Sequence, residues 1–380
     1  MNKPISGKFL ILPILFVCFI LQSSAQTLPK KKQILKQMRL TNQYFMDKWP
    51  DAGKIIVTNK ARPSNIWTRG VYYEGLMALH AIDKKKAYYD YAVQWGEKHN
   101  WGLAGTVKTR HADNHTAGQT YIDLYLMDKQ PERIKDIKES IDLMVKSEKN
   151  DDWWWIDAFQ MAMPVFTRLG VLYNDNTYFD KMYDLYSYTK HKHGGNGLYN
   201  QADKLWWRDK DFVAPYKEPN GEDCYWSRGN GWVVAALART LEMLPKSDPH
   251  YNEYLQDYKD LMAAVLPVQR SDGFWNVSLH DPNHFGGKET TGTALFVYGM
   301  AWGINHGILD KATYLQPLTR GWNAMAKESV HPNGFLGYVQ GTGKEPKDGQ
   351  PVTYTSKPDF EDYGLGCFLL AGTEVYKLKK

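Results

Sequence analysis

Two aspartates stand at the start of apolar, helix-like segments, where they could carry out acid–base chemistry. Asp157 follows Trp153, Trp154 and Trp155, and Asp113 precedes the segment "TAGQTYIDLYLM". Two carboxylates flanking a glycosidic bond are the usual equipment for glycoside chemistry, one as acid and the other as base or nucleophile. The alternative for each is a helix N-cap. Burial against tryptophan would raise the pKa of Asp157 and a helix N-terminus would lower it, so the sequence leaves its role open.

The stretch "CYWSRGNGWV", residues 224–233, combines an arginine with flat aromatic side chains. Arg228 can hold a carboxylate through a two-pronged contact, and Trp226 and Trp232 offer faces that suit a pyranose ring. Asn230 lies between two glycines, which allow close approach of the backbone. We therefore predict a sugar-binding turn. The alternative is a helix-entry turn with core tryptophans.

Other candidate substrate contacts lie in similar aromatic and polar segments. They are His115, Trp155 and Trp207, with an ordinary polar turn residue as the alternative for His115. Residues 197–203 and 205–212 occupy the longest link between helical segments and are predicted to form a lid or wall of the site. Glu289, just before "TTGTALFVYGMAWGI", is interpreted as a helix cap rather than a functional residue.

The elements that must position these residues are helices of two alternating kinds. One kind is charged and amphipathic, as expected of a helix with one face in water. It comprises residues 30–48, 84–99, 131–146, 177–193, 248–269 and 311–330. The other kind is apolar on most faces, as expected of a buried helix. Its segments begin at Thr68, Thr116, Ile156, Arg228, Thr290 and Asp362.

This alternation of six wet and six buried segments predicts an all-α fold, an (α/α)6 barrel with an inner ring of parallel helices and an outer ring running the other way. An open superhelical stack is the alternative. In the barrel, the loops before the inner helices meet at one end, which we expect to be the binding face. Cys224 and Cys367 belong to inner segments that are not ring neighbours, so we expect free thiols.

The N-terminal segment and the net charge of the 380-residue chain limit the compartment in which it acts and the partners that it binds. Residues 1–25 read as a signal peptide, which leaves residues 26–380 as a single catalytic domain. A lipoprotein at Cys18 is disfavoured by Val17. Without Lys3 and Lys8 the net charge falls from +5 to +3, too weak and diffuse for nucleic acid. We expect an exported protein, periplasmic rather than secreted, with no membrane partner, metal or cofactor.

Several segments together resemble a known family. They are "WWWIDAFQMAMPVFTRLG", "YWSRGNGWVVAAL", "DGFWNVSLHDPN…KETTGTALFVYGMAWGI" and "DYGLGCFLLAGTEVYKL". From about Lys30 onward the chain is similar to the unsaturated rhamnogalacturonyl hydrolases (glycoside hydrolase family 105) and related unsaturated glucuronyl hydrolases. The resemblance implies an (α/α)6 barrel and hydration of the C4=C5 bond of an unsaturated uronic acid at the end of an oligosaccharide. The resulting hemiketal collapses and releases the sugar.

The resemblance also implies roles for individual residues. Asp157 matches the aspartate that donates the proton and activates water, Asp113 matches a second aspartate near the site, and Trp226, Arg228 and Trp232 match substrate contacts. Asn200-Gln201 stands where many relatives carry a histidine that faces the substrate, so a galacturonate or glucuronate origin of the uronate stays open. A polysaccharide lyase, a conventional glycosidase and a non-catalytic carbohydrate-binding protein are the alternative functions, and the oligomeric state is open.

Overall fold

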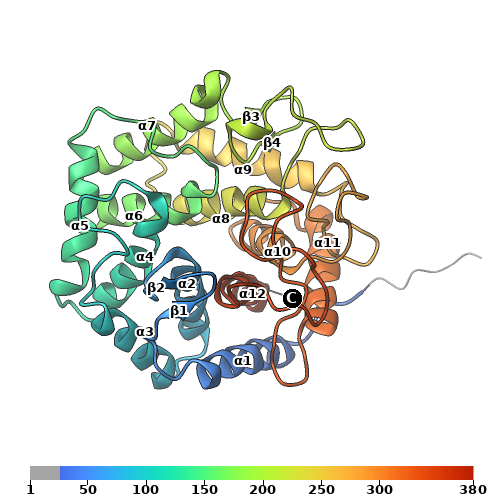
Figure 1. Cartoon of the computed structure of the whole chain (residues 1–380), viewed down its shortest axis with the longest axis horizontal. Helices are drawn as coiled ribbons and strands as arrows, with labels where there is room; N and C mark the ends of the chain where they lie inside the picture. The colour runs from blue at the N-terminus through green and yellow to red at the C-terminus, as the bar shows by residue number, and fades with distance from the viewer. Residues whose placement is uncertain (1–25, 380) are drawn as a thin grey trace, which may run out of the picture.

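Within residues 26–379, which the computed structural model describes, twelve α-helices form two concentric rings (Figure 1). The predicted signal peptide lies outside the described residues. The inner ring consists of α2 (Trp67–Ile82), α4 (Ala112–Met127), α6 (Ala158–Tyr173), α8 (Ser227–Met243), α10 (Thr290–Asn305) and α12 (Asp362–Lys377). The outer ring consists of α1 (Lys31–Lys48), α3 (Lys86–Lys98), α5 (Glu132–Val145), α7 (Thr177–His191), α9 (Tyr251–Val265) and α11 (Lys311–Ala324), which continues into a π-helical turn at Met325–Ser329.

The inner ring is closed. Each inner helix packs against the next one in the chain, and α12 packs back against α2. Helices α3, α5, α7, α9 and α11 each pack against an inner helix next to them in the sequence, whereas α1 packs against α12, the last inner helix. The predicted (α/α)6 barrel is therefore confirmed. The open stack is excluded because the last inner helix contacts the first.

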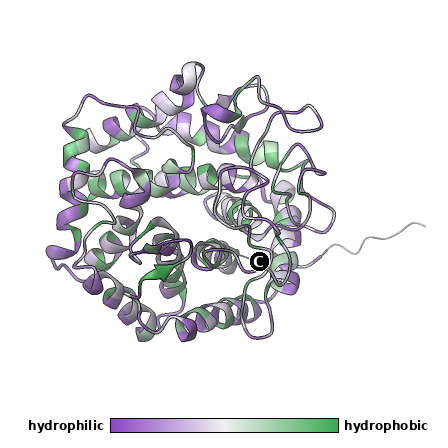
Figure 2. Ribbon diagram, viewed as in Figure 1, coloured by the Kyte–Doolittle hydropathy of each residue, from purple (hydrophilic) through white to green (hydrophobic). Residues whose placement is uncertain are grey.

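Burial explains why the two rings differ in sequence. Helix α10 is buried on all sides from Thr290 to Gly303. Helix α5 buries only one stripe, which includes Ile134, Ile137 and Ile141, at the three- and four-residue spacing of a helix face. The outer helices accordingly carry both hydrophilic and hydrophobic residues (Figure 2).

Two helices differ from their predicted bounds for local reasons. Helix α4 begins at Ala112 rather than Thr116, which puts Asp113 in its first turn, where an acidic side chain is favourable. Helix α9 ends at Val265 rather than Gln269, because Pro267 has no backbone N–H with which to continue the helical hydrogen bonds.

Four short strands in the described part of the chain form two antiparallel hairpins outside the helices. They are β1 (Ile56–Val57) with β2 (Ala61–Arg62), and β3 (Tyr199–Asn200) with β4 (Leu205–Trp206). One-turn 3₁₀ helices lie at His193–Gly195 and Lys210–Phe212. Among residues 26–379, no helix combines the length and hydropathy needed to cross a bilayer. Cys224 and Cys367 are buried and free, as predicted.

Candidate active site

A cavity of about 190 Å³ lies at the end of the barrel where four inner helices begin. It is lined by Trp67, Asp113, Trp155, Asp157, Met161, Arg208, Trp226, Arg228, Trp232, Thr342 and Gly343. At ~30 Å³ per water molecule, this is about the volume of six waters, which suits one sugar ring better than a chain. The starts of the inner helices thus form the concave aromatic face expected from the sequence.

Asp157 is buried in this cavity with one carboxylate oxygen free. It occupies the N-cap position of α6, but its side chain makes no capping hydrogen bond, so the N-cap alternative is wrong for this side chain. Its Oδ2 accepts a hydrogen bond from Arg208 Nε at 2.8 Å, whereas its buried Oδ1 has no partner among the described residues. Burial raises the pKa of Asp157 and outweighs the opposing charges of Arg208 and Arg228. Burial therefore makes the carboxyl group of Asp157 a weaker acid than an exposed aspartate.

Arg208 reaches Asp157 from the segment that follows β4. The backbone N–H of Ile156 donates to the carbonyl of Arg208 at 3.0 Å, which aligns the chain before Asp157 with this segment. Arg208 Nη1 also donates to Asp209 Oδ2 at 2.7 Å, so the guanidinium bridges two carboxylates. Of the two segments predicted to form a lid or wall, 205–212 contributes Arg208 to the cavity lining and 197–203 contributes no residue. Arg208 itself was not predicted, since its partner Asp157 lies in a different segment of the sequence.

Asp113 supplies the second carboxyl group of the cavity. Burial raises its pKa to about 7, with a further contribution from the charge of Asp157 and an opposing one from Arg208. His111 Nδ1 lies 3.8 Å from Asp113 Oδ2, and burial lowers the pKa of this histidine. At neutral pH the mouth therefore presents a neutral imidazole beside a carboxyl group poised near its titration point.

The stretch at residues 224–233 forms another wall and anchors a distant loop to it. Arg228 Nη1 and Nη2 donate to the backbone carbonyls of Gln340 and Gly341 at 2.9 and 2.8 Å. Trp226 Nε1 donates to Gln340 Oε1 at 2.9 Å. These bonds use two of the five N–H groups of Arg228, and its buried Nε has no partner among the described residues, so the contact with a substrate carboxylate stays a prediction. Arg228 and Trp226 also fix the loop that brings Thr342 into the cavity.

Three predicted contacts do not line the cavity. The side chain of Asn230 makes two hydrogen bonds with the backbone of Trp206. Its Nδ2 donates to the Trp206 carbonyl at 3.0 Å, and its Oδ1 accepts from the Trp206 N–H at 2.9 Å. His115 is buried against Ser140, 3.1 Å away. Trp207 lies beside Tyr225, with ring centroids 6.0 Å apart.

Chain geometry explains these three displacements. Asn230 and His115 each follow a cavity residue by two positions on a helix, which turns their side chains toward another face. Trp207 directly precedes Arg208 in an extended segment, where consecutive side chains point to opposite sides. These three residues therefore belong to segments that line the cavity, but their side chains lie on other faces of those segments.

Two further sequence interpretations can be placed in the structure. Asn200 does not line the cavity, because its side-chain amide donates to Tyr225 Oη at 2.6 Å within the β3–β4 region. Glu289 caps α10, accepting from the N–H groups of Thr291 and Gly292 at 2.8 and 2.7 Å. The predicted cap is therefore confirmed.

Some cavity residues gave little or no signal in the sequence. Trp67 lies in one of the aromatic segments before an inner helix, but nothing distinguished it from core tryptophans. Thr342 and Gly343 belong to the long connection between α11 and α12, and Met161 lies one turn into α6. Only the packing of the ring brings these residues together.

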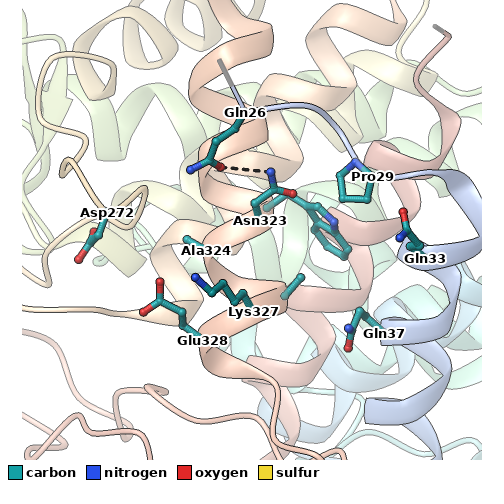
Figure 3. Close-up of a pocket in the computed structure, with 11 residues that line it drawn as sticks. Gln26, Pro29, Gln33, Gln37, Asp272, Asn323, Ala324, Lys327 and Glu328 are labelled. Carbon is teal, nitrogen blue, oxygen red and sulfur yellow. Dashed lines mark hydrogen bonds between the residues drawn. The ribbon is translucent and has the colours of Figure 1, made fainter. Parts of the chain in front are cut away.

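A larger cavity of about 500 Å³ lies near α11 and the N-terminal segment and has different chemistry (Figure 3). Its carboxylates are already neutralised by cations. Asp272 pairs with Arg270 at 2.8 Å, and Glu328 pairs with Lys288. No counterpart of the unpaired Asp157 oxygen lines this cavity, so the smaller one is the better candidate for acid–base chemistry.

Comparisons with known proteins show the family of the chain. The sequence profile of Glycosyl Hydrolase Family 88 matches residues 37–379. A Formosa agariphila protein described as an unsaturated 3S-rhamnoglycuronyl hydrolase is 31% identical over 334 residues, which are 83% of this chain and 85% of the relative. A family 88 glycosyl hydrolase structure from Bacteroides vulgatus is 29% identical, with a TM-score of 0.84, and the match covers 92% of this chain and 100% of that one.

A second solved structure, described as a polysaccharide lyase, is 30% identical, with a TM-score of 0.82 over 91% of this chain and 97% of that chain. The resemblance predicted from the sequence is confirmed by the profile and by these relatives. Because the profile spans nearly all of the described barrel, the chain belongs to Glycosyl Hydrolase Family 88 and is a glycoside hydrolase.

Proposed function

We propose that the protein removes a 4,5-unsaturated uronic acid from the non-reducing end of lyase-generated oligosaccharides by adding water across the C4=C5 bond. The observation that carries the proposal is the buried Asp157, whose Oδ1 is unpaired and whose pKa is raised. A raised pKa increases the protonated fraction of the carboxyl group at a given pH, and the protonated form is the one that can act as a general acid. The family and the name of the Formosa agariphila relative support this substrate class, with rhamnose as the candidate leaving sugar.

In the first step Asp157 donates its proton to C4. The π electrons of the double bond form a new C4–H bond, and C4 and C5 stay joined by a single bond. Positive charge develops on C5 and the ring oxygen. Water then attacks C5 and returns a proton to the Asp157 carboxylate, which regenerates the acid. The product is a hemiketal. Its C5–O bond to the ring oxygen breaks to give a ketone at C5, and the exposed hemiacetal at C1 then releases the neighbouring sugar as an alcohol.

The surrounding residues have distinct tasks in this reaction. Arg208 uses Nε and Nη1 for Asp157 and Asp209, which leaves Nη2 as the donor for the uronate carboxylate. Trp226 and Trp232 supply aromatic surface for the sugar ring. Asp113, with a pKa of about 7, can accept a hydrogen bond from the attacking water or a sugar hydroxyl. The proposed reaction therefore requires one general acid, Asp157, and one water molecule held in position.

The test is an Asp157→Asn variant assayed by loss of the ultraviolet absorbance of unsaturated disaccharides. The amide cannot donate a carboxyl proton, so we expect kcat to fall by about 10²- to 10⁴-fold, with the circular dichroism spectrum unchanged. Asp90→Asn is the control, since Asp90 lies on α3 in an exposed pair with Lys86. Full turnover by the Asp157 variant would contradict the assignment.

A lyase is the second candidate, favoured by the similar structure described as a polysaccharide lyase. A lyase creates the unsaturated uronate, so absorbance would rise when the protein is incubated with an intact polymer. An enzyme that adds water across the C4=C5 bond consumes the unsaturated uronate, so absorbance would fall when the protein is incubated with an unsaturated disaccharide. The sign of the change separates the two reactions in one assay.

A further inference from the structure

A groove of about 490 Å³ runs along the outer helix α5, away from the active-site cavity. It is lined by residues of α5 and its ends, between Pro131 and Lys146, and by Tyr125 and Tyr173 from the inner helices α4 and α6. Helix α5 lies in the outer ring, at the left of Figure 1. Tyr125 follows Asp113 by twelve residues on α4, about 18 Å along the helix axis. The groove shares no lining residue with the active-site cavity, so the two are separate places on the molecule.

Two tyrosines from different inner helices give the groove its aromatic surface. Tyr125 lies near the end of α4 and is half-buried, whereas Tyr173, the last residue of α6, is 43% exposed. Lys129 Nζ lies 4.6 Å from the centroid of the Tyr125 ring, and Lys138 Nζ lies 4.8 Å from that of the Tyr173 ring. Each ring therefore has a cation beside it. This pairing of an apolar ring with a positive charge suits a sugar that carries an acidic group.

The positive charge of the groove is only partly neutralised by the protein. Lys138 pairs with Asp142 at 2.6 Å. Lys135 and Lys146 form no ion pair and no side-chain hydrogen bond among residues 26–379. Glu139 is the one carboxylate of the lining without a cation partner in the described chain. Two unpaired lysines thus face one unpaired carboxylate, and the groove carries net positive charge.

We propose that this groove is a second carbohydrate-binding site, which holds an anionic glycan chain against the outside of the barrel. The chemistry that it recognises is a uronate carboxylate or a sulfate ester beside a sugar ring. The inference goes beyond the proposed function, because this site binds a glycan without acting on it. Attachment to a polymer raises the local concentration of chain ends near the active-site cavity, as a second binding event does for any tethered pair.

A second copy of the chain fits this surface less well than a glycan does. Leu126, Met127 and Val171 are about half exposed next to the two tyrosines, and such side chains could also pack against a protein. A symmetric dimer uses the same patch on both subunits, so it would bring Lys135 and Lys146 of both copies to one interface. Lysine is also depleted at protein interfaces. An anionic glycan instead complements the charge of the groove.

The experiment measures how strongly native gels that contain a polymer retard the protein. The polymers are polygalacturonate, carrageenan and dextran, which supply carboxylates, sulfate esters and no charge, respectively. The groove variants are Tyr173→Ala and the double variant Lys135→Gln/Lys146→Gln. The turnover of an unsaturated disaccharide and the circular dichroism spectrum are measured for each protein.

Each groove variant has a matched control elsewhere on the surface. Lys32→Gln/Lys36→Gln removes the same two charges from exposed positions of α1. Tyr376→Ala removes a partly buried tyrosine near the end of α12. None of these three residues lines the groove or the active-site cavity. The controls therefore separate a local site from a general effect of net charge or of losing a tyrosine.

For an anionic polymer, we expect the double lysine variant to raise the apparent Kd by about tenfold, the equivalent of one charge-assisted hydrogen bond. Tyr173→Ala should raise it by about three- to tenfold through the lost aromatic surface. The controls, and the disaccharide kcat/KM of all variants, should stay within about twofold of the wild type, because distant sites act independently. Retardation by polygalacturonate alone identifies a carboxylate, and retardation by carrageenan alone identifies a sulfate ester.

Several results would overturn the proposal. They are no retardation by either anionic polymer, equal retardation by dextran, and equal losses in the groove variants and their controls. Self-association of the wild type in analytical ultracentrifugation, lost in Tyr173→Ala, would assign the surface to a second copy instead. The proposed function fails separately, if the wild type consumes no unsaturated disaccharide, and the polymer-binding result still decides the groove.

Discussion

At the scale of single residues, Arg208 controls the protonation of Asp157. Burial raises the pKa of Asp157, and the ion pair with Arg208 opposes that rise. In Arg208→Gln the opposing charge is gone, so the pKa of Asp157 should rise further. The proposed reaction starts from the protonated acid. The decline of kcat at alkaline pH should therefore shift to higher pH, as a pH profile of kcat can show.

Arg208→Lys serves as the matched comparison because it keeps the charge without the forked geometry. In Arg208→Lys, the alkaline decline of kcat should occur at a pH closer to that of the wild type than the decline in Arg208→Gln does. Both variants should raise KM if Nη2 contacts the uronate. If the alkaline decline of kcat in Arg208→Gln stayed at the wild-type pH or moved to lower pH, Arg208 would not act on the pKa of Asp157.

At the scale of elements, the contact between α2 and α12 closes the ring and depends on a glycine. A Cβ added to Gly366 would lie 2.2 Å from the carbonyl oxygen of Val71, which is backbone and cannot swing aside. Gly366→Ala must push α12 away from α2. We expect it to lower the free energy of unfolding by about 1–3 kcal/mol, the usual cost of overpacking, as measured by urea denaturation.

Glu139→Ala is a control for this experiment, because Glu139 is exposed on the outer helix α5. Its effect should stay within about 0.5 kcal/mol. If Gly366→Ala were as harmless as the control, the two inner helices could not be packed as closely as the structure shows. A loss of activity in Gly366→Ala without a loss of stability would also contradict the predicted role.

At the scale of the whole molecule, a buried polar network inside the ring makes stability depend on pH. Glu74 on α2 accepts a hydrogen bond from Gln160 on α6 at 2.7 Å, and Arg239 on α8 donates to Gln119 on α4 at 2.9 Å. Burial raises the pKa of Glu74 to about 7, although Arg239 opposes the rise. Four inner helices therefore share one titratable cluster.

The sign of the pH effect follows from the raised pKa. Below the pKa that Glu74 has in the unfolded chain, this residue is protonated in both the folded and the unfolded state. It then has no effect on how the free energy of unfolding changes with pH. Between that value and about 7, the unfolded chain loses the proton while the folded one keeps it, so the free energy of unfolding falls as pH rises. Between pH 4 and 8, the wild type should lose on the order of 3 kcal/mol more than Glu74→Gln.

Urea denaturation of both proteins at several pH values measures this difference. Glu139→Gln is the control, since an exposed glutamate should leave the wild-type slope unchanged. The comparison between variant and wild type cancels the titration of the other carboxylates, including Asp113. Parallel stability curves for the wild type and Glu74→Gln would contradict the raised pKa of Glu74.

The sequence by itself determined the barrel and the helix starts that carry the acidic pair. Helical period and burial are local patterns, so twelve segments of two kinds could be read directly, and ring closure followed from their alternation. Asp157, Asp113, Trp155, Trp226, Arg228 and Trp232 were predicted because each lies just before an inner helix or within its first two turns. The cavity contains all six.

Only the tertiary structure decided which atoms meet in the site. Arg208 pairs with Asp157 from 51 residues away, and Gln340 meets Trp226 from 114 residues away. Which face of a segment points inward also depends on the packing of its neighbours, which is why Asn230, His115 and Trp207 were misplaced. The competition between burial and the helix terminus at Asp157 was settled in favour of burial, because a pKa depends on surroundings assembled from the whole ring.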